Sequence, residues 1–153
     1  MSNMTFGEWV RVYQIPPQAV AAFYGMVLPV SNVTATSEAA TQNLIRIEAS
    51  KYGFTMWRNN NGAVTTDDGR HIRFGVGNDS KKLNEIWKSP DLIGIGPNGR
   101  FVGCEVKRPD WRAPENNRDR AQLNCLNQIN ALGGIGFFAT SEEDYEKRMN
   151  ENA

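Results

Sequence analysis

Residues 90–107 read PDLIGIGPNGRFVGCEVK, and this stretch predicts a hairpin of two β-strands. A first strand over 91–95 runs into the turn 96–99, GPNG, whose glycine, proline and asparagine are typical of a chain reversal. A second strand over 100–107 then returns beside the first. Everything else that the sequence predicts extends from this hairpin.

The hairpin is expected to bring Asp91 close to Glu105, fourteen residues later in the chain. Side chains alternate along a strand, so Glu105 and Lys107 should share one face. The other face carries apolar side chains that can enter a core: Val102, Cys104 and Val106. One face of this strand is therefore predicted to carry the functional side chains, and the other to pack in the core.

The flanking segments predict a single domain over residues 36–153. An N-terminal helical extension over 1–35 precedes it, and its short helix is expected after Pro16-Pro17. A helix is expected from Thr36 or Ser37 to Gly53, and another over 117–132 with its leucines and Ile129 facing inward. The remaining expected elements are a strand over 54–58, a hairpin over 63–74 that continues the sheet, a segment over 75–88 that loops out, a strand over 135–139 and a final helix from Ser141.

The order of these elements predicts the fold class. The helix between the strand of Glu105 and the strand 135–139 is a crossover, which favours parallel pairing, whereas the hairpin 91–107 is antiparallel. We therefore expect an α/β sandwich whose mixed central β-sheet is flanked by helices.

Composition restricts the function and the compartment. Lys plus Arg and Asp plus Glu number 17 each, so any binding of a polyanion must rely on charge gathered at one site. Cys104 and Cys125 lack a CxxC pairing, which predicts buried thiols in a reducing compartment. No stretch of 18 apolar residues occurs, and the start carries Glu8 in place of a basic region, so a soluble cytoplasmic protein without membrane contact is expected.

Two carboxylates and an ammonium at this spacing suit metal-dependent hydrolysis of a phosphodiester. Asp91 and Glu105 are the natural oxygen ligands for Mg²⁺, with the carbonyl of Val106 as a further ligand and Mn²⁺ as a substitute ion. Lys107 would project beside the ion, where it can orient the attacking water and offset negative charge in the transition state. The chain's histidine, His71, is read as structural, which argues against histidine-based nuclease chemistry.

The combination of Asp91, Glu105 and Lys107 resembles the PD-(D/E)XK nuclease superfamily. Further residues narrow the resemblance to the VRR-NUC branch, over roughly residues 37–140: PDLIG at 90–94, GRFVGCEVK at 99–107, Gln122, Gly133-Gly134, Glu38, Arg58-Asn59 and Gly69-Arg70. The chain departs from the family pattern at 81–88, where a usually short link into the PD strand is longer.

The resemblance carries expectations for fold, site and partners. It implies a restriction-endonuclease-like sandwich in which Glu38 assists the metal and Gln122 completes the catalytic set. The competing interpretations are that Glu38 complements the helix dipole in its first turn, and that Gln122 is a buried side chain bonded to main chain. Family members are similar to Mg²⁺ or Mn²⁺ endonucleases that act on branched or flapped DNA, and the small stand-alone ones to homodimeric Holliday-junction resolvases of phages and bacteria. By that resemblance the chain would cut DNA, leave a 5′-phosphate, and act in a bacterial or phage-infected cell.

Basic and aromatic residues near the motif are candidates for DNA contact. The arginine candidates are Arg58, Arg108, Arg112, Arg118 and Arg120. Those after Lys107 are interleaved with Asp110, Glu115 and Asp119, so ordinary surface charge is the competing interpretation. Trp111 can stack on an unpaired base or serve as a packing lid.

Other functions stay open at this point. A catalytically inactive DNA-binding or dimerisation module would keep the same fold, and a restriction-like or RNA-directed nuclease would keep the same site. Two clustered carboxylates favour an enzyme, because their mutual repulsion where a phosphate must approach is relieved by a cation.

Overall fold

The computed structural model describes residues 4, 6–16, 19–20, 23 and 37–152. The helices are α1 (Phe6–Val12), α3 (Glu38–Lys51), α4 (Lys81–Ile86), the short 3-10 helix η1 (Pro97–Gly99), α5 (Asn117–Ala131) and α6 (Glu142–Glu151). The strands are β1 (Thr55–Arg58), β2 (Gly62–Thr65), β3 (His71–Phe74), β4 (Leu92–Ile95), β5 (Phe101–Val106) and β6 (Ile135–Ala139).

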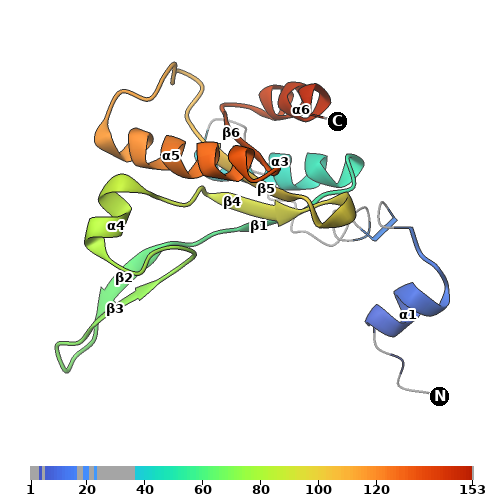
Figure 1. The fold of residues 1–153 in the computed structure, drawn as a ribbon, viewed down its shortest axis with the longest axis horizontal. Helices are drawn as coiled ribbons and strands as arrows, with labels where there is room; N and C mark the ends of the chain where they lie inside the picture. The colour runs from blue at the N-terminus through green and yellow to red at the C-terminus, as the bar shows by residue number, and fades with distance from the viewer. Residues whose placement is uncertain (1–3, 5, 17–18, 21–22, 24–36, 153) are drawn as a thin grey trace.

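Across the described residues, four strands form a mixed sheet in the order β1-β4-β5-β6. The predicted hairpin is present, since β4 and β5 pair antiparallel with Leu92 opposite Cys104. The crossover through α5 makes β6 parallel to β5, as expected. The protein is therefore a mixed α/β structure whose central sheet is flanked by helices (Figure 1).

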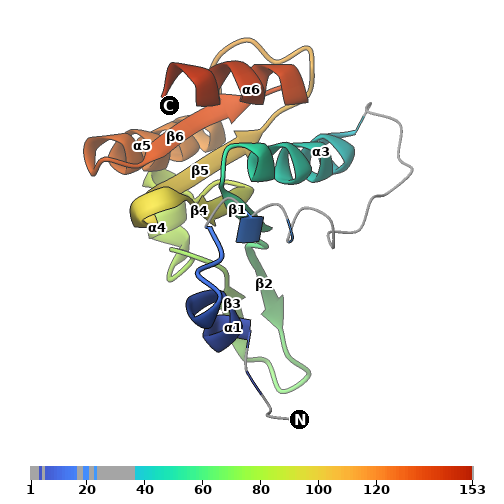
Figure 2. The same cartoon turned by 90° about the vertical axis from the view of Figure 1, so that its right-hand side faces the viewer.

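Helices α3 and α6 cover one face of the sheet, and α5 lies on the other with α4 beside it (Figure 2). The core on the α3 and α6 face holds Ile45 and the fully buried Tyr145. The apolar residues of β5 reach this core, as alternation predicted: Val102, Cys104 and Val106. Cys125 on α5 is also buried, so both thiols have the burial expected of them.

A pair of glycines lets α5 approach the sheet. Gly103 on β5 lies opposite Gly136 on β6. A Cβ atom at Gly136 would stand 2.5 Å from the main-chain oxygen of Leu126, and one at Gly103 would stand 2.6 Å from the Cδ1 atom of Ile129. Helix α5 therefore packs almost directly on the backbone of these strands.

One inward residue of α5 was predicted wrongly. Leu132 is 80% exposed, whereas Leu126 is buried. Helix α5 ends at Ala131 and Leu132 is its C-cap, followed by Gly133 at a φ of 85°. The left-handed glycine turns the chain away, so the helical spacing that placed Leu132 inward no longer applies.

The hairpin of β2 and β3 was expected to continue the sheet, and that prediction is wrong. Within the described part of the chain it is a separate two-stranded sheet that projects from the body (Figure 1). The buried Asn78 closes its base, because its Nδ2 donates to the carbonyls of Gly62 and Phe74. The main-chain groups at the base of the hairpin thus bond to a side chain in place of a sheet neighbour.

The segment before Ser89 does not loop out as predicted. Ser80 caps α4 by accepting a hydrogen bond from the amide of Leu83. Trp87 then donates its indole N–H to Oε1 of Gln128 on α5 at 2.7 Å. The longer link into the PD strand is therefore a helix that packs on α5.

The N-terminal region is described in part. Helix α1 lies before Pro16, while the helix expected after Pro16-Pro17 falls mostly on residues outside those that the structure describes. Among the described residues, no helix is long and apolar enough to cross a membrane.

The glycine pair yields a stability prediction. Gly136→Ala should lower the free energy of unfolding by about 3 kcal/mol, because the backbone of α5 must move away from the new methyl group. Gly103→Ala should cost only about 1 kcal/mol, since the flexible end of Ile129 can shift. Urea unfolding of both variants measures the difference, and equal losses would show that α5 does not limit this approach.

Candidate active site

The hairpin brings Asp91 and Glu105 together, and main-chain amides donate hydrogen bonds to both carboxylates, which confirms their predicted proximity. The amide of Asp91 donates to Oε2 of Glu105 at 3.1 Å. The amide of Val106 donates to Oδ2 of Asp91 at 3.3 Å. Each carboxylate is therefore oriented by the backbone of the opposite strand.

Asn59, the residue after β1, holds the backbone of Asp91 in place. The amide of Asn59 donates to the carbonyl oxygen of Asp91 at 2.7 Å. The side chain of Asn59 donates to the carbonyl of Pro90 and to Oγ of Ser89, both at 2.9 Å. The resemblance included the pair Arg58-Asn59, and Asn59 is the residue of this pair that supports the backbone next to Asp91.

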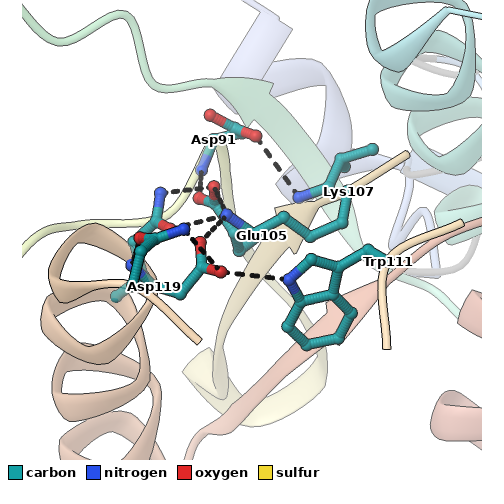
Figure 3. A network of polar contacts seen from close by, with 8 residues as sticks. Asp91, Glu105, Lys107, Trp111 and Asp119 are labelled. Atoms are coloured by element: carbon teal, nitrogen blue, oxygen red, sulfur yellow. Dashed lines mark hydrogen bonds and ion pairs between the residues drawn. The ribbon is translucent and has the colours of Figure 1, made fainter. Parts of the chain in front are cut away.

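Lys107 points its ammonium into the protein beside Glu105 (Figure 3). Its side chain is 11% exposed, and Nζ lies 2.7 Å from Oδ1 of Asp119, 2.7 Å from Oε1 of Gln122 and 3.2 Å from Oε1 of Glu105. An ammonium has three N–H donors, so these oxygens can use all of them. The ammonium of Lys107 is thus held at a defined position.

Gln122 connects the two residues of the ExK motif. It is fully buried, its Nε2 donates to Oε1 of Glu105, and its Oε1 accepts from Lys107. The sequence left open whether this glutamine bonds to main chain. Its hydrogen bonds go to the two motif side chains, so it belongs to the same polar network.

Asp119 belongs to this network as well, although the sequence suggested surface charge. It is 5% exposed, and its Oδ2 accepts hydrogen bonds from Nε1 of Trp111 at 3.1 Å and Nδ2 of Asn116 at 3.2 Å. A signal was present in the sequence. Asn116 caps α5 with Asp119 three residues later, and Gln122 follows at the next i+3 position on the same face.

Burial and like charge perturb the two motif carboxylates. Burial, followed by the neighbouring charge of Asp91, raises the pKa of Glu105 to about 7. Burial also raises the pKa of Asp91, and the charge of Glu38 adds to that rise. Ionised together, these groups store repulsion that a cation would relieve.

The pKa values of the neighbouring groups shift differently. Burial would raise the pKa of Asp119, but hydrogen bonds from Lys107 and Trp111 outweigh it and the pKa is lowered. Lys88, which the sequence did not indicate, is half-buried close to the site, and burial and the charge of Arg118 lower its pKa. Asp119 therefore stays ionised as the permanent partner of Lys107.

A polar cleft opens above the network. Its walls include Glu38 at the start of α3, Trp111 in the loop after β5, and Asn116 and Asp119 at the start of α5. Glu38 is exposed and acts on Asp91 through charge, so the structure places it at the rim of the cleft. A direct metal contact from Glu38 stays a prediction.

The arginine candidates lie on the surface, and two of them, Arg108 and Arg112, line this cleft. Arg108 pairs with Asp110 at 3.7 Å, and Arg112 donates to the carbonyls of Pro109 and Trp111. Two more are exposed on α5 and one at the end of β1: Arg118, Arg120 and Arg58. All five are accessible to a polyanion.

Trp111 is packed in the manner of a lid. Its ring lies against Phe138 with the centroids 4.7 Å apart, and its indole N–H is bonded to Asp119. Of the two interpretations that the sequence offered, these contacts favour packing over base stacking.

The donor set suits a hard divalent cation. Among the described residues, no three acidic, cysteine or histidine side chains converge as a metal site. An ion here would therefore take Asp91, Glu105, the carbonyl of Val106 and water, which Mg²⁺ tolerates because it retains several waters. The raised pKa values of both carboxylates are consistent with a place for positive charge.

Comparison with known protein families, curated protein sequences and solved structures gives no match for this chain.

The pKa of Glu105 predicts how stability depends on pH. Between its ordinary value of 4.5 and about 7 the folded state holds this proton and the unfolded chain does not, so stability falls as pH rises through that window. Glu105→Gln should flatten the fall, because the group that titrates is gone. Urea unfolding across this range measures it, with Glu115→Gln, which changes an exposed carboxylate in the loop after β5, as the matched control. Parallel curves for Glu105→Gln and the wild type would contradict the assignment.

Proposed function

We propose that this protein is a Mg²⁺-dependent DNA endonuclease that hydrolyses phosphodiester bonds and leaves a 5′-phosphate. The observation that carries the proposal is the convergence of Asp91, Glu105 and a buried Lys107 at one end of the central sheet, beside a polar cleft. The resemblance to VRR-NUC nucleases supports the same chemistry, and the mixed sheet between α5 and the pair α3 and α6 is consistent with a restriction-endonuclease-like sandwich.

Each residue has a defined task in this proposal. Asp91 and Glu105 hold the ion, which when bound polarises the phosphodiester and lowers the pKa of a water. Lys107 offers positive charge to the phosphoryl oxygens as charge accumulates on them. Gln122 fixes the orientation of Glu105 and shares the ammonium of Lys107. The exposed arginines bind phosphates on either side of the scissile bond.

The burial of the acidic pair favours an enzyme over an inactive binding module. A surface that merely binds DNA gains nothing from Glu105, which is 2% exposed and faces the negative charge of Asp91. A cation between DNA and this pair makes use of both charges. The inactive module is the alternative if DNA is bound but not cleaved. An RNA-directed or restriction-like nuclease is the alternative if RNA or plain duplex DNA is the preferred substrate.

The choice of substrate and partner rests on the resemblance. We propose branched DNA, including Holliday junctions, as the substrate, a homodimer as the active form, and the cytoplasm of a bacterial or phage-infected cell as the location. The substrate is tested with a panel of labelled nucleic acids: four-way junctions, flaps, nicked and linear duplexes, and RNA. The mass of the protein in solution tests whether it is a homodimer.

Removal of either motif charge should abolish cleavage. Asp91→Ala and Lys107→Ala are expected to lower the rate of Mg²⁺-dependent cleavage by more than about 100-fold, because the first removes a metal ligand and the second removes charge at the phosphate. Initial rates on the preferred DNA measure the loss.

Asp67→Ala and Lys81→Ala are matched controls for this experiment, since both residues are exposed on other elements. They should cleave at the wild-type rate. Circular dichroism and the unfolding midpoint check that the motif variants fold. Full activity of either folded motif variant would rule out this site, and DNA binding without cleavage by the wild type would favour the inactive module.

The arginines predict a salt dependence. Arg118 is exposed, and its charge acts on both Asp91 and Lys88. Arg118→Ala should weaken DNA binding in EDTA uniformly across sequences and reduce the slope of log affinity against log salt by about one. Arg70→Ala, at the distant hairpin where Asp68 pairs with the arginine, is the control. An unchanged slope would remove Arg118 from the DNA contacts.

A further inference from the structure

Lys107 lies between two carboxylates with different tasks. Its Nζ is 2.7 Å from Oδ1 of Asp119 and 3.2 Å from Oε1 of Glu105. The shorter distance marks Asp119 as the stronger partner. The sequence motif names Glu105 and Lys107, and the helix after it supplies a third charged group that the motif does not contain.

A pairing of Lys107 with Glu105 would work against metal binding. An ammonium and a divalent cation compete for the same carboxylate oxygens, and Glu105 already accepts hydrogen bonds from the amide of Asp91 and from Gln122. A second negative partner for Lys107 lowers this competition, because the ammonium no longer depends on Glu105 for its compensation.

The surroundings of Asp119 hold it rigidly in that role. Its Oδ2 accepts from Trp111 and Asn116, and its own amide donates to Oδ1 of Asn116 at 2.8 Å. Phe138 completes the enclosure, since its ring centroid lies 5.6 Å from the ammonium of Lys107 and its ring packs on Trp111. Oδ1 of Asp119 is thereby aimed at the ammonium.

We propose that Asp119 is a positioning residue that retains the Lys107 ammonium, so that Glu105 stays available to a divalent cation. The inference rests on the proposed metal site and adds a residue to it. Asp119 does not bind the ion or the DNA. It acts by determining which carboxylate Lys107 neutralises.

Binding of Mn²⁺ to the free protein tests this without any cleavage. Asp119→Asn keeps the shape and an oxygen acceptor but removes the charge, so Lys107 should turn to Glu105 and Mn²⁺ should bind about tenfold more weakly. Titration followed by electron paramagnetic resonance of free Mn²⁺ gives the affinity. Asp110→Asn, on the wall of the same cleft and paired with Arg108, is the control and should change the affinity less than about twofold.

A double-mutant cycle separates this role from a general effect of charge. In a Lys107→Met background there is no ammonium to release, so Asp119→Asn should leave Mn²⁺ affinity within about twofold. An equal weakening in both backgrounds would mean that Asp119 acts on the ion by long-range charge, which overturns the inference.

The variants also separate this inference from the proposed function. If Asp119→Asn binds Mn²⁺ with the same affinity as the wild type, the role of Asp119 is refuted and the nuclease proposal still stands. Wild-type protein that does not bind Mn²⁺ refutes the metal site itself. Should Asp119→Asn not fold, Trp111→Phe replaces it, because this variant removes one of the two hydrogen bonds that hold Oδ2 of Asp119, without a change of charge. Weaker Mn²⁺ binding then supports the inference, and unchanged binding overturns it.

Discussion

The burial of one carboxylate, that of Glu105, constrains the rest of this structure. An ionised group under a helix is costly unless its oxygens are compensated, and here the compensation comes from three separate parts of the chain. The residue before β4 supplies the amide of Asp91, the residue after β5 is Lys107, and α5 supplies Gln122. The compensation is incomplete, since the pKa of Glu105 is raised to about 7. That residual cost is what makes a cation the natural completion of the site.

The topology of the sheet explains why these parts meet. Antiparallel pairing of β4 with β5 returns the chain to Asp91, and the parallel crossover to β6 carries α5 across the face opposite the core. The glycine pair in β5 and β6 brings that helix close enough for Gln122 and Asp119 to reach Lys107. Packing and chemistry are thus coupled, because the residues that admit the helix also determine how deeply the charges are buried.

Charge is organised locally in a chain of zero formal net charge. Acidic groups lie within the site or on the wall of the cleft, and the exposed Arg108 and Arg112 line the same cleft. Such an arrangement suits a polyanion that approaches along the rim and meets a cation at the centre. The projecting β2 and β3 hairpin begins close to the site, where Asn59 and Asn61 both donate to Ser89.

The sequence by itself determined the acidic hairpin, the alternation of its faces, the parallel strand after α5 and the burial of both cysteines, because each follows from local periodicity or from handedness. Tertiary structure decided the rest. Asp119 and Lys107 are twelve residues apart, and their ion pair depends on how closely α5 packs. The separate hairpin sheet follows from Asn78, and the outward turn of Leu132 from a glycine after the helix. Periodicity records which face a residue prefers, whereas partners across elements arise only once the layers are packed together.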